Sequence, residues 1–222
     1  MDNIKTAPVI AIDTETTGLD SSADEILQLS IVSDNGVTLF NDYFKPRNRT
    51  EWADAEKVNN ISPEMVKDCR YISEWLPQIN QIFAAAEKIV GYNSPFDLGF
   101  LRAAGVEIPE SAEIVDVMQM FAEIKGDRDE VQNGYKWHKL TECAEYCGYH
   151  WNGNAHDSLE DARATMYCYK KLADSLKISR SPLMMVFAQM LINKVSPPID
   201  QPVPRKQNPV NVHKPPNSGY KQ

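Results

Sequence analysis

The spacing of apolar and polar residues predicts an α/β fold that begins with three neighbouring strands. Val9–Ile12 is an apolar run that is typical of a buried strand ended by polar and turn residues. Two longer runs rich in β-forming residues follow at Ile26–Ser33 and Val37–Phe44, with the turn sequence Asp34-Asn35-Gly36 between them. Since such short connections join neighbouring strands, the three runs are expected to form an antiparallel meander.

Residues 52–176 are expected to add two short strands and a series of helices. The strands are expected at Lys88–Tyr92 and Ile114–Val117, which makes five in all. One helix opens at Ser94-Pro95, with serine as its cap and proline at its first position, and ends at Gly105. Asp127–Lys136 is expected to be a polar loop. The other helices are expected at Trp52–Val58, Pro63–Lys67, Ser73–Ala86, Met118–Ile124, Leu140–Cys147 and Ser158–Leu176.

The chain is expected to divide into three parts. Residues 1–180 hold the α/β pattern, and residues 181–195 hold an apolar helix, Leu183–Ile192. A helix that is apolar nearly all round is buried, either on its own domain or on a partner protein. Seven prolines among residues 196–222 predict an extended, disordered tail, which could also dock on a partner protein.

The net charge argues against a protein that holds a long nucleic-acid duplex. The 222 residues carry a formal charge of −8, whereas duplex-binding proteins are usually basic. The tail has a local charge of +3, which leaves −11 on the other 195 residues. A phosphate-bearing ligand can still bind if its contacts are few and metal ions supply positive charge. This favours recognition of a short end.

The four cysteines show no disulfide framework, which predicts free thiols in a reducing cytoplasm. No apolar run approaches the roughly 18 residues that a membrane span needs, so no membrane contact is expected. His138, Cys143, Cys147 and His150 are spaced somewhat like zinc ligands. However, their spacing is wider than in most zinc sites, and the two cysteines fall on an apolar helical stripe, which favours core packing.

Two carboxylates follow the first strand. Side chains two residues apart on a strand share a face, so Asp13 and Glu15 are expected to point the same way, roughly 7 Å apart along the backbone. Such a pair repels itself unless a proton or a cation intervenes, and oxygen ligands suit Mg²⁺ or Mn²⁺. A solvated strand end is the alternative interpretation.

Two later motifs supply further candidate groups. Asp97 lies in the first turn of the helix after the fourth strand, where it either joins the carboxylates or only complements the helix N-terminus. His156 precedes a helix capped by Asp157 or Ser158, and Asp161 lies in the early turns of that helix. This arrangement suits a metal ligand beside a general base on a loop. Asp116 is interpreted as a helix cap.

The three motifs, taken in order, resemble those of the DEDDh exonuclease family. These are the DnaQ-like 3′–5′ exonucleases, which include the proofreading epsilon subunit of bacterial DNA polymerase III. IDTETTGL, NSPFDLGFL and HDSLEDA are similar to the family's three exonuclease motifs, and the resemblance covers about residues 8–176. One departure is Tyr92, where many members have a histidine before the asparagine. The resemblance implies a ribonuclease H-like fold, a five-stranded mixed sheet flanked by helices.

The resemblance also implies a metal-dependent 3′–5′ exonuclease that acts on single-stranded 3′ ends of DNA. Two ions, Mg²⁺ or Mn²⁺, are expected to serve the two oxygens of an in-line displacement, with Asp13 between them. Glu15 and Asp161 would complete one site, Asp97 would hold the other ion, and His156 would take the proton of the attacking water. The expected contacts of the 3′-terminal nucleotide are Thr16, Gly18 and Leu19, with Leu19 as a wedge against its base. The same cleft is expected to be lined by Asn93 and Phe96, which completes the set of substrate-binding residues.

Three alternatives stay open from the sequence. A close relative would trim RNA ends. A phosphatase could use Asp13 as its nucleophile, but that chemistry expects a second aspartate where Glu15 stands, and it leaves His156 and Asp161 without a role. A non-catalytic subunit could bind ends or a polymerase, although the set of acidic and histidine residues is intact. The sequence also leaves open whether the protein proofreads for a polymerase or trims ends as a free enzyme. Its oligomeric state is open as well.

Overall fold

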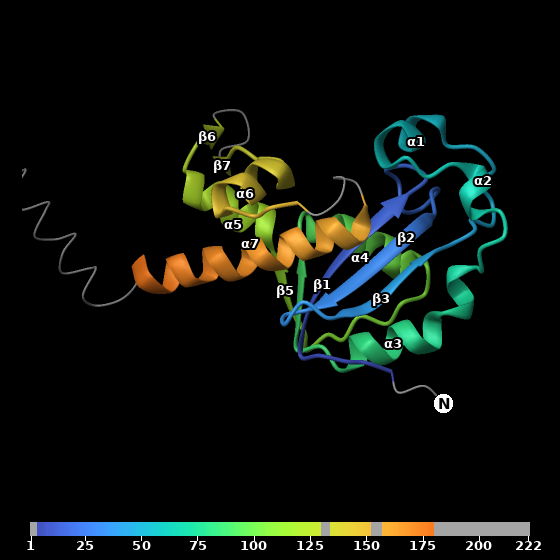
Figure 1. The fold of residues 1–222 in the computed structure, drawn as a ribbon, viewed down its shortest axis with the longest axis horizontal. Helices are drawn as coiled ribbons and strands as arrows, with labels where there is room; N and C mark the ends of the chain where they lie inside the picture. The colour runs from blue at the N-terminus through green and yellow to red at the C-terminus, as the bar shows by residue number, and fades with distance from the viewer. Residues whose placement is uncertain (1–3, 130–133, 152–156, 180–222) are drawn as a thin grey trace, which may run out of the picture. The chain divides into compact units, whose positions relative to one another are not determined.

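A five-stranded mixed sheet forms the centre of the protein (Figure 1). The computed structural model describes residues 4–129, 134–151 and 157–179. The strand order is β3-β2-β1-β4-β5. The first three strands pair antiparallel, as the short turns predicted, and β4 and β5 run parallel to β1. The strands are β1 (Val9–Thr16), β2 (Ile26–Ser33), β3 (Thr38–Tyr43), β4 (Lys88–Gly91) and β5 (Glu113–Asp116).

The first strand is longer than its apolar run predicted. It continues past Ile12 to Thr16, because β2 is buried along its whole length and pairs with it as far as Thr16↔Ile26. Asp13 and Glu15 therefore lie on the strand, opposite Ser30 and Gln28, and not on a turn after it. The parallel pairing with β4 ends at Ala11↔Val90, so β1 extends beyond β4 and carries both carboxylates to the edge where α4 begins.

The helices lie close to their predicted positions. They are α1 (Ala53–Asn59), α2 (Pro63–Val66), α3 (Leu76–Ala84), α4 (Ser94–Ala103), α5 (Val117–Lys125), α6 (Leu140–Cys147) and α7 (Ser158–Ser179), with a short 3₁₀ helix η1 (Ile72–Glu74). The single helix predicted over Ser73–Ala86 is divided at Trp75, and α3 has Pro77 in its first turn, where no intrahelical N–H is needed. Asn93, in the left-handed conformation, caps α4, so Ser94 is helical and is not the predicted cap.

The sheet separates two hydrophobic clusters. Ile10 and Ile12 on β1 pack with buried residues of α3 and α4 on one face, including Phe83 and Phe100. On the other face, Ala11 packs with buried residues of α5, α6 and α7. This alternation follows from the two-residue period of a strand. It predicts which helices the polar end of β1 faces: Asp13 and Glu15 share the face of Ala11, whereas Thr14 shares the face of Ile12.

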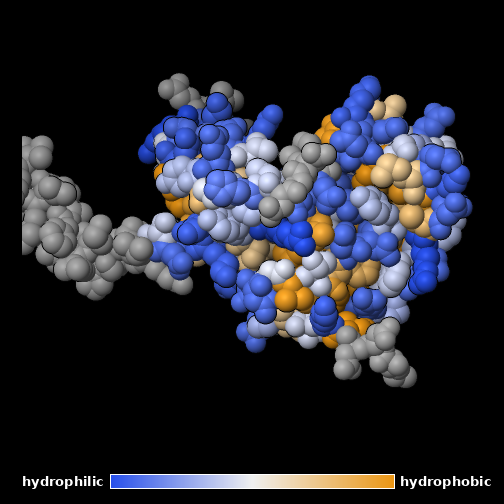
Figure 2. Space-filling model, viewed as in Figure 1, coloured by the Kyte–Doolittle hydropathy of each residue, from blue (hydrophilic) through white to orange (hydrophobic). Residues whose placement is uncertain are grey.

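The segment predicted as a polar loop contains a small ribbon. The two short strands β6 (Arg128–Asp129) and β7 (Gly134–Tyr135) pair antiparallel. Residues 130–133 between them lie outside the described residues. The predicted apolar helix Leu183–Ile192 and the tail 196–222 also lie outside the described residues, so the three-part division of the chain stays a prediction. Residues 1–178 form one compact unit. Hydrophilic residues cover most of the face shown in Figure 2. Among the described helices, none is long and apolar enough to span a membrane.

Candidate active site

Three carboxylates from two elements converge at the polar end of β1. Asp13 and Glu15 point toward the helices on their face of the sheet, and Asp161 lies in the first turn of α7 on that face. One carboxylate oxygen from each residue lies within 4.8 Å of the others. The sequence predicted the first two side chains from strand alternation, and the fold adds the third from a residue almost 150 positions later.

Asp97 is held beside the edge of the same strand that β4 leaves unpaired. Its Oδ1 accepts a hydrogen bond from the Thr14 N–H at 2.9 Å and another from the Thr14 hydroxyl at 2.7 Å. The side chain is buried, with 3% of the residue exposed. Thr14 therefore joins the first turn of α4 to β1 between the two other carboxylates, a role that the sequence analysis missed. The available signal was the strand alternation that continues from Ile10 and Ile12 to Thr14.

Burial and mutual repulsion make these carboxyl groups hard to ionise. Burial raises the pKa of Asp13 well above its usual range, and the charges of Asp97 and Asp161 raise it further. Burial, followed by the charge of Asp161, raises the pKa of Glu15 to about 8, although a hydrogen bond that the carboxylate accepts from Asn59 lowers it. Burial also raises the pKa of Asp97 to about 7, despite the bonds from Thr14. A divalent cation would offset both the burial of these charges and their mutual repulsion, and oxygen ligands suit such a cation.

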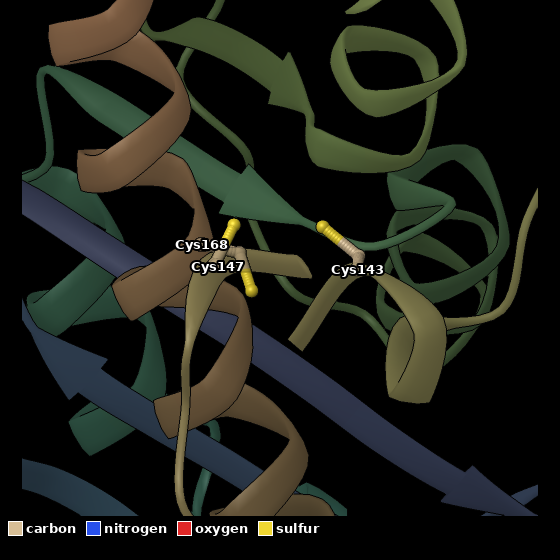
Figure 3. Close-up of side chains that lie close together, drawn as sticks. All are labelled: Cys143, Cys147 and Cys168. Atoms are coloured by element: carbon tan, nitrogen blue, oxygen red, sulfur yellow. The ribbon is translucent and has the colours of Figure 1, made fainter. Parts of the chain in front are cut away.

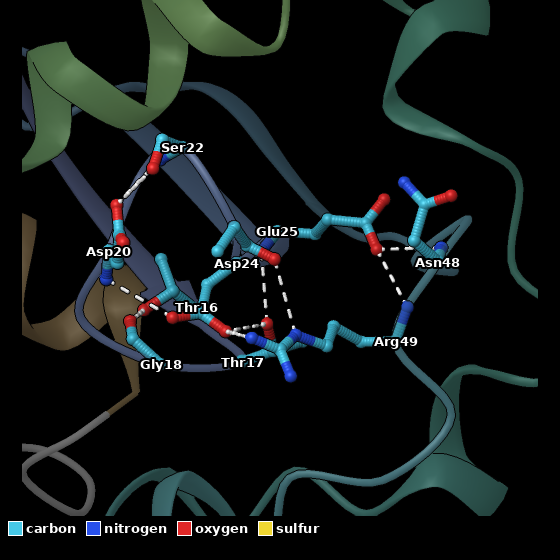
Figure 4. Close-up of polar contacts among 10 residues, drawn as sticks. Thr16, Thr17, Gly18, Asp20, Ser22, Asp24, Glu25, Asn48 and Arg49 are labelled. Atoms are coloured by element: carbon cyan, nitrogen blue, oxygen red, sulfur yellow. Dashed lines mark hydrogen bonds and ion pairs between the residues drawn. The ribbon is translucent and has the colours of Figure 1, made fainter.

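The loop after β1 is fixed by a polar network (Figure 4). The Thr16 hydroxyl donates to the Gly18 carbonyl at 2.6 Å, and the Thr17 hydroxyl donates to Asp24 at 3.3 Å. A Cβ added to Gly18 would lie 2.3 Å from Asp24 Oδ2, so a larger residue would force the Asp24 side chain or the loop to shift. Next to it, Leu19 is 87% exposed. An apolar side chain presented on a fixed backbone is suited to contact a ligand.

A cleft of about 530 Å³ begins at Glu15 and runs beside this loop. Four of the five predicted substrate-binding residues line it, namely Thr16, Gly18, Leu19 and Phe96. The fifth, Asn93, is not among the lining residues. It caps α4, and its N–H donates to Asp116 Oδ1 at 3.0 Å. Asp116 also caps α5 by accepting from the Met118 N–H, as predicted. A substrate-binding role for all five residues stays a prediction.

Asn59 is a further buried polar residue at the cleft that sequence reasoning missed. Its side chain donates to the Thr16 carbonyl at 3.2 Å and accepts from the Ile61 N–H at 3.0 Å. It thus connects the end of α1 with the end of β1. The polar pair Asn59-Asn60 before an apolar residue could have indicated a helix end, and Asn60 does adopt the left-handed conformation there.

His156 lies outside the described residues, and its role as a base stays a prediction. The residue that follows it, Asp157, caps α7 by accepting from the Leu159 N–H at 3.0 Å. The N–H of Ser158 donates to Gln28 Oε1 at 3.3 Å, which anchors the start of α7 to β2. The predicted helix start after His156 is therefore confirmed.

The comparisons with known proteins agree with this site. Residues 10–169 match the profile of the RNase_T family, which is described as exonuclease. The chain belongs to this exonuclease family. It is 30% identical over 179 residues to the uncharacterized exonuclease CP81 of Escherichia phage 186, a match that covers 74% of this chain and 87% of the phage protein.

Two further matches are to a DNA polymerase and to a solved exonuclease structure. It is 27% identical over 173 residues to the PolC-type DNA polymerase III of Caldanaerobacter subterraneus subsp. tengcongensis, covering 76% of this chain but only 12% of that polymerase. The solved structure of exonuclease X in complex with 5′ overhanging duplex DNA superposes with a TM-score of 0.57 at 20% identity, covering 75% of this chain and 92% of that one. The predicted ribonuclease H-like fold is confirmed.

The exonuclease also contains a thiol cluster away from the carboxylates (Figure 3). Cys143 and Cys147 of α6 meet Cys168 of α7, with one sulfur from each within 4.8 Å of the others. Burial raises the pKa of the Cys147 thiol to about 12, and the contact with Cys143 and burial raise that of Cys168. Cys143 and Cys168 are buried in the hydrophobic cluster that contains Ala11 and Phe121, and Cys147 packs against that cluster, so the three thiols are part of the core. His138, one of the two histidines in the zinc-like spacing, contacts Asp127 and Glu142.

Proposed function

We propose that this exonuclease removes nucleotides in the 3′–5′ direction from single-stranded ends of DNA, with two divalent cations, Mg²⁺ or Mn²⁺. The convergence of Asp13, Glu15 and Asp161 carries the proposal, because it places three oxygen donors from two elements within reach of one ion. The RNase_T match and the cleft beside Glu15 support it.

Four carboxylates would hold the ions. Asp13 would be shared by both, Glu15 and Asp161 would complete one site, and Asp97 would hold the second ion directly or through water. The ions would supply an activated water, a stabilised leaving oxygen and neutralised charge on the phosphoryl group. The raised pKa values of Asp13, Glu15 and Asp97 fit this assignment, since a cation favours the ionised form of each.

The other residues would orient the strand and move a proton. Leu19 would wedge against the terminal base, and Thr16, Gly18, Asn93 and Phe96 would contact the last nucleotide. His156 would accept the proton of the attacking water. The oxygen of that water forms a bond to phosphorus while the bond from phosphorus to the 3′ oxygen of the preceding nucleotide breaks. The products are a nucleoside 5′-monophosphate and a shortened strand.

A polymerase or another protein is the proposed partner. The matched region forms a small part of a PolC-type DNA polymerase III, which supports a proofreading role for this exonuclease. The segment that would contact the partner is the predicted apolar helix at residues 181–195 or the Pro-rich tail after it.

Cleavage of end-labelled oligomers tests the proposal. A 5′-labelled single strand should give a ladder that shortens with time, and a 3′-labelled strand should release only labelled mononucleotide. Chelator should stop the reaction, and Mg²⁺ or Mn²⁺ should restore it. Matched single-stranded, mismatched and RNA oligomers compare the substrates. If the RNA oligomer is cleaved faster than the matched DNA oligomer, RNA is the substrate and the DNA assignment is wrong. Release of mononucleotides from the 5′ end would refute the 3′–5′ polarity.

Asp13→Asn provides the matching variant test. Loss of the shared ligand should abolish cleavage, whereas the exposed Asp68→Asn should cleave like the wild type. Cleavage by Asp13→Asn at the wild-type rate would refute the metal assignment.

A further inference from the structure

A single arginine supplies the positive charge of the cleft. Among the described residues that line it, the charged ones are Glu15, Arg49, Glu51 and Asp54. A nucleic-acid strand carries a negative charge at every linkage, so this acidic wall repels it. We propose that Arg49 binds an internucleotide phosphate of the substrate strand. This inference rests on the proposed function and identifies a residue that sets the affinity for the strand.

The guanidinium of Arg49 is held in place from one side. Its Nη2 lies 2.9 Å from Asp24 Oδ1, and its Nε donates to the Ala23 carbonyl at 3.2 Å. Figure 4 shows the third guanidinium nitrogen turned away from Asp24. The Arg49 side chain is 44% exposed, whereas that of Asp24 is only 10% exposed. A guanidinium has five donors in a rigid fork, so it can contact a carboxylate and a phosphate at once.

The backbone that carries Arg49 is fixed as well. The carboxylate of Glu25 accepts from three successive N–H groups, those of Arg47, Asn48 and Arg49, at 2.8, 2.8 and 2.9 Å. The carboxylate of Asp24 also accepts from the Asp20 N–H at 3.1 Å. Arg49 therefore belongs to the network that also holds Thr17 and Asp20, the residues on either side of Gly18 and Leu19. A phosphate bound by Arg49 would be positioned relative to the residues proposed to hold the terminal nucleotide.

The chain offers a matched control on the same segment. Arg47 is two residues away, but its guanidinium lies over the Tyr71 ring at 4.4 Å and donates to the Ser73 hydroxyl at 2.6 Å. It lines a different cavity, together with Tyr71 and Ser73. Arg47→Gln removes the same charge without changing the cleft. Asp24→Asn is the second control, because it removes the ion pair but keeps Arg49.

The affinity for a labelled single-stranded DNA oligomer measures the phosphate contact. Fluorescence anisotropy in chelator gives Kd without cleavage, and cleavage in Mg²⁺ gives kcat and KM. Arg49→Gln should raise Kd and KM roughly tenfold, as the loss of one charge-assisted hydrogen bond predicts. It should also reduce the slope of log Kd against log salt by roughly 0.7. The kcat and thermal midpoint of Arg49→Gln should equal those of the wild type. For Arg47→Gln, the Kd, KM, kcat, salt slope and thermal midpoint should all equal those of the wild type.

Oligomers with one neutral methylphosphonate linkage locate the contact. When the linkage bound by Arg49 is neutral, the wild type and Asp24→Asn should bind the oligomer more weakly than they bind the fully charged oligomer. Arg49→Gln should bind the two oligomers equally well. Equal Kd values for wild type and Arg49→Gln, or a fall in kcat and thermal midpoint with an unchanged Kd, would overturn the proposal. A wrong polarity or metal requirement would instead appear in the wild type, so the two failures are distinguishable.

Discussion

At the scale of single residues, the carboxylates at the end of β1 link ionisation to folding. The pKa of Glu15 rises from 4.5 to about 8 and that of Asp97 from 3.8 to about 7 in the folded chain. The folded state thus binds more protons than the unfolded state between about pH 4 and pH 8. The metal-free protein should therefore lose stability as pH rises through this range.

Thermal unfolding in chelator checks this sign. The midpoint should fall from pH 5 to pH 8, and Glu15→Gln should make that fall shallower. Added Mg²⁺ should raise the midpoint more at pH 8 than at pH 5, because the ligands must be deprotonated. A midpoint that rises with pH in the metal-free protein would contradict the repulsive cluster.

The proposed base, His156, gives the second prediction at this scale. His156→Ala should lower kcat by roughly 10²–10⁴, the usual contribution of a general base, while the metal affinity survives. Activity of the wild type should decline as pH falls through the pKa of the histidine, near 6.5 when unperturbed. Single-turnover rates and metal titrations of the two proteins check both parts. An unchanged rate, or a loss of metal binding, would exclude the base role.

Individual residues were predictable where a local period fixes them. The alternation of a strand places Asp13 and Glu15 on one face, and cap chemistry places Asp97, Asp116 and Asp157 at helix starts. The bonds from Thr14 to Asp97 and from Asn59 to the Thr16 carbonyl join residues 83 and 43 positions apart. No local pattern encodes such partners, because they depend on how the helices pack on the sheet.

At the scale of elements, the sequence prediction was wrong where tertiary contacts determine the bounds or the existence of a strand. Apolar runs and turn residues predicted the five strands of the central sheet and the order of the helices. The extension of β1 to Thr16 depends on pairing with β2, and the β6–β7 ribbon depends on pairing between short polar segments. A strand that is stabilised by its neighbour has little propensity signal of its own.

The loop between β1 and β2 gives the prediction at this scale. Gly18→Ala places a methyl group against the Asp24 carboxylate, which Arg49 and Asp20 hold in place, so the loop must shift. Activity should fall roughly tenfold or more, because misplaced substrate contacts are costly, while the fold survives. Gly99→Ala is the matched control. Its methyl group would meet only Ser21 at 3.5 Å, and alanine favours a helix interior by about 0.5–1 kcal/mol. Equal activities of the two variants would contradict the role of this loop.

At the scale of the whole molecule, the order of the three motifs predicted the family, and the family match confirms it. A single motif is ambiguous, since acidic residues at strand ends and helix starts have ordinary structural uses. Three motifs in order require one fold that brings their residues together. The sequence could not show that Arg49 is the cation of the cleft, because the segment that carries it meets the end of β1 and Phe96 of α4 only in the folded chain.

The boundary of the catalytic unit gives the last prediction. Residues 1–178 form a compact unit, and residues 196–222 contain too many prolines and too few apolar side chains to offset the entropy of ordering. A chain that ends at Ser196 should keep its thermal midpoint and its turnover on short single-stranded oligomers. The +3 charge of the tail predicts a loss only on long substrates at low salt, or in the capture of a partner protein. If the shortened chain instead unfolds or fails to cleave a short oligomer, the tail belongs to the catalytic fold.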